Sequence, residues 1–200
     1  MWKRFVTAMV TSQTRITASF WERLNEHEEW RGLVRANGRQ LPTRSSLERC
    51  FRETGIRFPR QKAERLKTSR NVSFEELASA TRGMLASTHD RGASWKARRQ
   101  AEVRIAELVE QRLRGAGVAP KIARLMLTGT GDCHHLVPID SRWLATLARL
   151  GVVVSPQQLS RESGYRLVED QIVRAAHELR VHPVLADGIA FGWLLDGGAR

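Results

Sequence analysis

The spacing of apolar residues is the feature that most limits what this chain can fold into. Apolar residues recur mostly at helical spacing, and no convincing run alternates with a period of two. One face of a first helix is marked by Trp2, Phe5, Val6 and Met9. A short valine run at 152–154 is the only strand-like piece, and it is weak. The pattern therefore predicts an all-α protein.

Residues that favour helix ends divide the chain into the expected helices. Pro120 suits the first position of a helix, and Ser73 with Glu76 three residues later has the spacing of a capping box. Thr43 is placed to cap a short helix that Gly55 ends. The polar and basic segment 87–99 is interpreted as a loop running into a helix. Further helices are expected at residues 16–24, 62–69, 103–113, 120–127, 140–150, 165–179 and 184–195.

The charge balance narrows the choice of partner. Lys plus Arg number 33 against 21 Asp plus Glu, which gives a net charge of +12. Such a charge favours a polyanionic partner, nucleic acid before membrane, although proteins from arginine-rich genomes are also basic. The two distant cysteines, Cys50 and Cys133, argue against a disulfide scaffold. With no signal peptide and no membrane-spanning run, we expect a soluble cytoplasmic protein associated with the nucleoid.

A glycine-containing turn at 113–120, Leu-Arg-Gly-Ala-Gly-Val-Ala-Pro, joins two expected helices. Gly115 and Gly117 permit left-handed backbone and close approach of another chain. Amides in the turn and at the start of the next helix are expected to point outward, near the positive end of that helix. They would suit a DNA phosphate. An ordinary helix–helix turn explains the same glycines, because short glycine motifs are weak evidence.

Lys121 and Asp140 are the candidate catalytic pair. An amine must be neutral to attack carbon, and a helix N-terminus and partial burial both lower a lysine pKa. Lys121 at the start of a helix therefore suits nucleophilic catalysis through a Schiff base, or else a phosphate contact. Asp140, expected to open a later helix, is either a cap or a group that offsets cationic charge on a sugar and orients the amine.

Together these residues resemble the helix-hairpin-helix DNA glycosylase superfamily. The segment 117–123, Gly-Val-Ala-Pro-Lys-Ile-Ala, is similar to the hairpin of endonuclease III-like members and places Lys121 at their Schiff-base lysine. Asp140, in Pro-Ile-Asp, then matches the catalytic aspartate of the family. The segments 55–64 and 185–198 most resemble the archaeal-type 8-oxoguanine glycosylase/lyases.

The resemblance covers most of the chain and implies two small helical lobes with a DNA-binding cleft between them. Residues 1–127 would form a helical barrel ending in the helix-hairpin-helix motif at about 103–127. Residues 128–200 would form the second lobe, which carries Asp140. The implied protein is a monomer that binds double-stranded DNA containing a damaged base.

The implied activity is that of a bifunctional DNA glycosylase and AP lyase. Lys121 would attack C1′ with help from Asp140 and expel an oxidised purine, first of all 8-oxoguanine, and the Schiff base would allow β-elimination. This chemistry needs no metal and no organic cofactor. Two alternatives stay open: a glycosylase for another modified base, and a non-catalytic helix-hairpin-helix protein that only binds DNA.

Other residues receive supporting roles. Gln13 lies in a segment similar to the one that wedges into the gap left by a flipped base. Trp193, His134 and His135 are candidates for the base pocket. Trp143 is better explained as core, and the spacing in 132–135, Asp-Cys-His-His, matches no standard zinc pattern. The candidate phosphate contacts are Gly115, Gly117, Ala119, Arg57 and Arg60, with Lys62, Arg98 and Arg99 behind them.

The chain departs from the family pattern at four places. Ala119 replaces a hairpin glycine, which weakens one phosphate contact. The first helix begins almost at Met1, so we expect an element that would precede it to be missing. The segment 87–99 is longer than the usual connection, and the tail after Trp193 is short. The two cysteines cannot build the four-cysteine iron–sulfur cluster of other branches.

Overall fold

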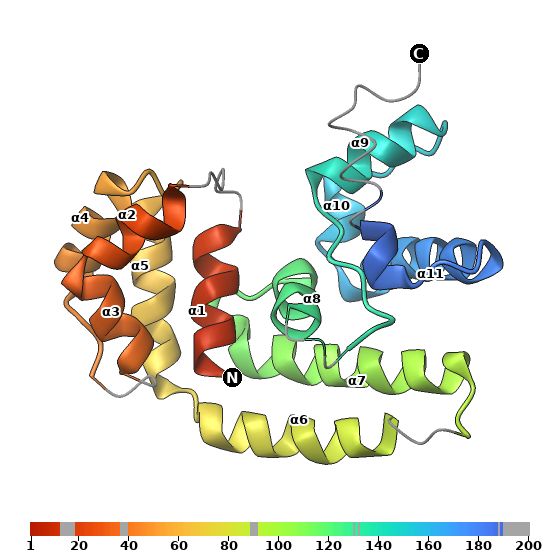
Figure 1. Cartoon of the computed structure of the whole chain (residues 1–200), viewed down its shortest axis with the longest axis horizontal. Coiled ribbons are helices and arrows are strands. Elements are labelled where there is room, and N and C mark those ends of the chain that lie inside the picture. Colours follow the sequence, from red (N-terminus) through yellow and green to blue (C-terminus); the bar gives the residue numbers. More distant parts are fainter. Residues whose placement is uncertain are drawn as a thin grey trace. The chain divides into compact units, whose positions relative to one another are not determined.

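The computed structural model of the chain describes residues 1–12, 19–36, 40–88, 92–129, 131, 133–187 and 189 (Figure 1). These residues form helices and connecting turns, and none of them forms a strand. The expected all-α fold is confirmed. The valine run 152–154 lies in a connection without regular structure.

The chain divides into two compact units. One holds residues 1–80 and 111–118, and the other holds residues 81–110 and 119–200. Two boundaries fall inside the helices α6 (Phe74–Thr88) and α7 (Trp95–Leu113), and the third falls between Val118 and Ala119. This division differs from the boundary expected near residue 127.

The first unit packs its helices around an aromatic centre. Trp2 and Phe5 of the first helix meet Phe74, with ring centroids 5.0 and 5.3 Å from the Phe74 ring. The indole Nε1 of Trp2 donates to the backbone oxygen of Leu33 at 2.8 Å, which ties the first helix to α3. The helices of this unit are α1 (Trp2–Thr11), α2 (Phe20–Glu26), α3 (Glu28–Arg35), α4 (Arg44–Glu53) and α5 (Pro59–Thr68), with the 3₁₀ turns η1 (Ser69–Asn71) and η2 (Arg114–Ala116).

The second unit has its own hydrophobic core. Its helices are α8 (Pro120–Thr128), α9 (Ser141–Arg149), α10 (Pro156–Leu159) and α11 (Glu162–Glu178), together with most of α7. Trp143 is a core residue, as expected. The buried cluster consists of Val137, Ile139, Trp143, Tyr165, Val168, Ile172 and Val173.

Most helix ends follow the signals in the sequence. Thr43 caps α4 by accepting a hydrogen bond from the Ser46 amide, and the hydroxyl of Ser73 accepts one from the Glu76 amide at 3.3 Å. Helix α3 was not predicted, and α7 begins at Trp95 rather than near residue 103. The expected helix 184–195 lies largely outside the described residues.

A buried charge network ties helices of the second unit together. The side chains of Arg124 and Glu169 are both completely buried. Arg124 donates to Glu162 and Glu169, and Arg99 contacts Glu169 and Asp170, each at 2.8 Å. Glu169 also accepts a hydrogen bond from the Val137 amide at 2.8 Å. Glu169 therefore links α11 to α7, α8 and the segment that leads to Asp140.

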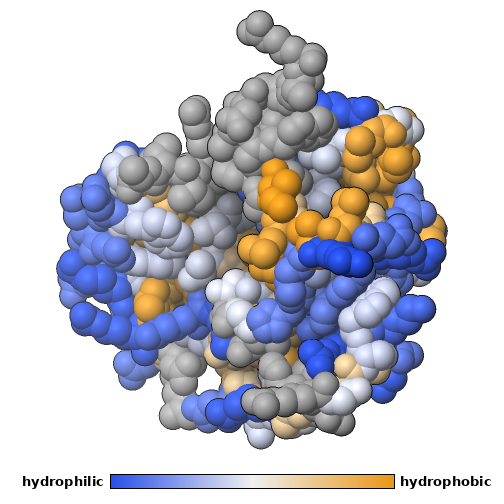
Figure 2. Space-filling model, turned by 45° about the vertical axis from the view of Figure 1, so that its right-hand side comes forward, coloured by the Kyte–Doolittle hydropathy of each residue, from blue (hydrophilic) through white to orange (hydrophobic). Residues whose placement is uncertain are grey.

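The surface is largely hydrophilic on the face shown in Figure 2, with hydrophobic side chains gathered in patches. In the described part of the chain, no helix is both long and apolar enough to cross a membrane. The large hydrophobic side chains that are most exposed are Leu150, Val153, Leu167, Leu179, Leu185 and Ile189.

Candidate active site

Lys121 lies in the first turn of α8, as the sequence predicted. Pro120 opens this helix, and Ala119 precedes it in an extended conformation without capping the helix through its side chain. Because Lys121 follows directly, its amine lies near the positive end of α8. The side chain is half-buried. Among the described residues, no hydrogen bond or ion pair engages its ammonium group.

Asp140 is the N-cap of α9. Its Oδ1 accepts hydrogen bonds from the amides of Arg142 at 2.9 Å and Trp143 at 3.3 Å. Its Oδ2 accepts one from Arg142 Nε at 2.6 Å. The capping interpretation of Asp140 is therefore correct. It does not exclude the catalytic one, because these bonds also hold the carboxylate in a fixed orientation.

The groups that shift the pKa of Lys121 include Asp140, its predicted partner. Burial lowers the pKa of Lys121, the charges of Asp140 and Asp187 raise it, and the charge of Arg142 lowers it. Lys121 and Asp140 belong to the same unit. Burial and Arg142 favour the neutral amine needed for attack, while two carboxylates are near enough to stabilise a cation that forms there.

Asp187 is one of the charged residues that act on Lys121, and the sequence did not single it out. Its carboxylate accepts a hydrogen bond from Trp143 Nε1 at 2.7 Å. Burial raises the pKa of Asp187, and the charges of Arg142 and Lys121 lower it. Asp187 lies within the tail segment used for the resemblance, but only the fold brings it close to Lys121.

Tyr165 holds the backbone just before Asp140. Its hydroxyl accepts a hydrogen bond from the Ile139 amide at 2.6 Å and donates one to the Val137 oxygen at 3.0 Å. Burial raises the pKa of Tyr165, so the hydroxyl stays protonated and able to donate. A core side chain of α11 thereby positions the segment that carries Asp140.

Replacing Tyr165 by phenylalanine is expected to lower the free energy of unfolding by about 1–3 kcal/mol, since a buried amide and a buried carbonyl lose their partner. Urea unfolding followed by circular dichroism measures the change. Thr128→Val is the control, because the hydroxyl of Thr128 makes only an intrahelical bond to the Arg124 oxygen. A loss no larger than that of the control would contradict the positioning role of Tyr165.

The hairpin uses part of its backbone internally. Gly117 is left-handed, with φ 71°, whereas Gly115 is not. The amide of Gly117 donates to the Arg114 oxygen at 2.9 Å, and that of Val118 to the Leu113 oxygen at 3.3 Å. The expectation that amides throughout the turn point outward is therefore wrong for these two. Among the described residues, the amides of Ala119 and Lys121 donate no hydrogen bond, so an anion would bind at the start of α8.

Arg65 is a basic residue at the hairpin that the sequence did not reveal. A Cβ atom on Gly117 would lie 2.6 Å from Arg65 Nε, so the Arg65 side chain runs directly over this glycine. The left-handed conformation favours glycine at 117, and a larger residue there would also displace the Arg65 side chain. Arg65 adds a positive charge where the hairpin is expected to meet a phosphate.

The other predicted DNA contacts have different outcomes. Arg57 and Arg60 are exposed at the start of α5 and remain candidates. Lys62 is buried and donates to the Val10 oxygen at 2.8 Å and to the Ser12 oxygen at 2.5 Å. Arg99 is buried in the charge network. Phosphate contact is therefore the wrong role for both. Gln13 and Trp193 lie outside the described residues.

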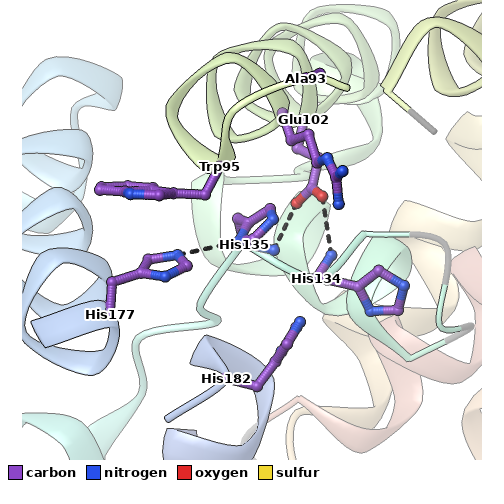
Figure 3. A pocket seen from close by; sticks show the side chains of 8 residues that line it. Ala93, Trp95, Glu102, His134, His135, His177 and His182 are labelled. Carbon is purple, nitrogen blue, oxygen red and sulfur yellow. Dashed lines mark hydrogen bonds between the residues drawn. The ribbon is translucent and has the colours of Figure 1, made fainter. Parts of the chain in front are cut away.

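His134 and His135 line a pocket of about 350 Å³ in the second unit (Figure 3). Burial lowers the pKa of His135 to about 4, with the nearby His177 and His182 adding to the effect. Neither His134 nor His135 is among the groups that shift the pKa of Lys121. Their expected role in a base pocket therefore stays a prediction. The full lining is Ala93, Trp95, Arg98, Glu102, His134, His135, His177 and His182.

Comparison with known proteins finds similar structures but no similar sequences among family models or curated proteins. No protein-family model matches the sequence, and no curated protein matches it. The structure is similar to that of Methanocaldococcus jannaschii 8-oxoguanine glycosylase/lyase in complex with a 15mer DNA containing 8-oxoguanine. The TM-score is 0.67 at 19% identity, over 100% of this chain and 82% of that chain.

The crystal structure of M. jannaschii 8-oxoguanine DNA glycosylase gives a TM-score of 0.66 at 20% identity. That match covers 99% of this chain and 78% of that chain. The chain therefore has the fold of these archaeal enzymes. The resemblance inferred from the hairpin and from Asp140 is confirmed at the level of the fold.

Proposed function

We propose that this chain is a DNA glycosylase with AP lyase activity that removes a damaged base from double-stranded DNA. The observation that carries the proposal is the half-buried Lys121 at the start of α8, with its lowered pKa and with Asp140 close by. The fold shared with 8-oxoguanine glycosylase/lyases supports it. So do the net charge of +12 and the exposed Arg57 and Arg60.

The proposed reaction begins when the damaged nucleotide is turned out of the duplex, at a cost that is smallest for a lesion. The neutral amine of Lys121 attacks C1′, the bond from C1′ to the base breaks, and the base leaves with the bonding electrons and takes up a proton. The nitrogen, now bonded to C1′, gives up one proton to the departing base. The bond from C1′ to O4′ then breaks, O4′ takes up a proton from solvent, and the nitrogen keeps its other proton as a protonated Schiff base. Asp140 stabilises the positive charge that develops on the sugar and on the nitrogen.

The lyase step follows from the same intermediate. The protonated Schiff base acidifies C2′, so a proton leaves C2′ and the bond from C3′ to its phosphate oxygen breaks. Water then hydrolyses the Schiff base and frees Lys121. The chain's own residues supply the nucleophile and the charge stabilisation that these steps need.

We propose 8-oxoguanine as the first substrate to test, because the DNA bound to the M. jannaschii enzyme contains that base. Borohydride reduces a Schiff base to a stable amine, so a covalent protein–DNA adduct is expected with an 8-oxoguanine duplex. Release of a different base from a lesion panel would correct the substrate and keep the mechanism. If neither a lesion duplex nor an abasic duplex gave an adduct, the chain would be a non-catalytic DNA-binding protein.

The pH dependence of trapping is expected to follow the charges around Lys121. Single-turnover trapping should rise with pH as the ammonium of Lys121 loses its proton, with a midpoint below the ordinary lysine pKa. Asp187→Asn removes a charge that favours the ammonium, so the midpoint should move to lower pH. Arg142→Gln removes a charge that disfavours it, so the midpoint should move to higher pH. Shifts in the same direction for both variants would contradict this electrostatic assignment.

A further inference from the structure

Four histidines gather in the pocket of Figure 3 and have no part in the proposed chemistry of Lys121. They are His134, His135, His177 and His182, out of six histidines in the chain. The first two precede Asp140, and the other two lie at and beyond the end of α11. Their spacing along the chain matches no zinc pattern, because the fold alone brings these four side chains together.

Two ring nitrogens in the pocket have the separation of ligands on one metal ion. Nδ1 of His135 and Nε2 of His177 are 3.3 Å apart. Two nitrogens that each lie about 2.0–2.1 Å from a tetrahedral zinc ion are separated by about 3.3–3.4 Å. In the structure the two nitrogens share a hydrogen bond, and an ion between them would replace it once both rings turn their lone pairs toward the ion.

The other two rings lie within reach of the same place. The ring of His182 stacks against that of His135 at 5.7 Å, and the ring of His134 meets that of His182 edge-on at 5.3 Å. In the described part of the chain, no three metal-binding side chains already converge on one point. A third imidazole would therefore come from a turn of His182, which is exposed and lines the same pocket. Water would complete the coordination.

The surroundings hold the first two ligands in place without an ion. The carboxylate of Glu102 accepts hydrogen bonds from the amides of His134 at 3.0 Å and His135 at 2.7 Å. The indole of Trp95 stacks on the His177 ring, with centroids 4.1 Å apart and an interplanar angle of 23°. Such outer contacts orient ligands in metal sites. Arg98 also lines the pocket, and its positive charge opposes a cation, while Glu102 partly offsets it.

The geometry points to a site for one divalent transition-metal ion that prefers imidazole, such as zinc, bound through His135 Nδ1 and His177 Nε2 with His182 as the third ligand. Imidazole nitrogen selects zinc, nickel or copper over magnesium and calcium, which prefer oxygen. A bound ion would fasten the segment leading to Asp140 onto the end of α11. The inference does not depend on the proposed repair activity.

Calorimetry with zinc tests the site on tag-free protein, freed of metal by a chelator. We expect about one equivalent to bind, and we expect His135→Gln and His177→Gln each to weaken binding by at least about tenfold. His27→Gln is the matched control, because His27 lies in the first unit, and it should bind zinc as the unaltered chain does. Magnesium should not compete.

Cobalt supplies a readout that adventitious binding would not reproduce. Bound Co²⁺ with nitrogen ligands should give a visible d–d absorption that disappears in His177→Gln, a variant of a partly exposed residue that is expected to stay folded. No zinc binding would overturn the proposal, as would several weak equivalents that His177→Gln leaves unchanged. The proposal would also be overturned if the four histidines changed only their protonation with pH and bound no metal.

Discussion

Replacing Lys121 by glutamine is expected to abolish the borohydride-trapped adduct and to slow strand cleavage at a damaged base by at least about 10³-fold. Glutamine has a similar length but cannot form a Schiff base. The side chain is half-buried and makes no hydrogen bond or ion pair among the described residues, so the fold should tolerate the change. Trapping with an 8-oxoguanine duplex and with an abasic duplex, resolved on a denaturing gel, measures both effects.

The matched control for this experiment is Lys3→Gln. Lys3 is an exposed lysine of α1, and it is not among the groups that shift the pKa of Lys121, so its loss removes the same charge without touching that group. The control should form the adduct at the rate of the unaltered chain. Normal trapping by Lys121→Gln would show that another amine is the nucleophile and would overturn the assignment of Lys121. Filter binding of undamaged duplex should change little in either variant, which separates chemistry from affinity.

The positions of Lys121 and Asp140 at helix starts could be predicted because the signals for them are local. Pro120 starts a helix, which puts Lys121 in the first turn, and Asp140 is an N-cap whatever else it does. The residues around the pair could not be predicted, because their closeness depends on packing between distant segments. Asp187 reaches the group through Trp143, and Arg65 reaches Gly117 from another helix. Neither contact has a signature in sequence spacing.

The same distinction explains the errors. Lys62 has the sequence context of a surface lysine at a helix start. In the structure it is buried and donates hydrogen bonds to backbone oxygens at the end of α1. Arg99 belongs to a basic run, yet it faces Glu169. Segment 87–99, by contrast, runs into a helix as predicted: Trp95 begins α7, and the Ser94 hydroxyl caps it by accepting a hydrogen bond from the Ala97 amide. For Lys62 and Arg99, a tertiary partner overrides local polarity.

Replacing Glu169 by alanine is expected to lower the free energy of unfolding by about 3–5 kcal/mol. The change leaves the fully buried Arg124 and the buried Arg99 with one carboxylate partner fewer each, and it removes the acceptor of the Val137 amide. A buried charge that loses its partner keeps its desolvation cost, which is why the effect exceeds that of an ordinary ion pair. Urea unfolding monitored by circular dichroism measures the loss.

Asp170→Asn is the control for Glu169→Ala. It also removes a negative charge from α11, but at a position that is not buried. Asp170 also contacts Arg99 at 2.8 Å, but its side chain is 47% exposed, so water compensates for the lost interaction. The control should therefore cost no more than about 1 kcal/mol. If Glu169→Ala were as mild as this control, the buried network would not be what fastens α11 to the segment before Asp140. The difference between the two neighbouring variants thus measures how strongly burial, rather than charge, holds the segment before Asp140 in position.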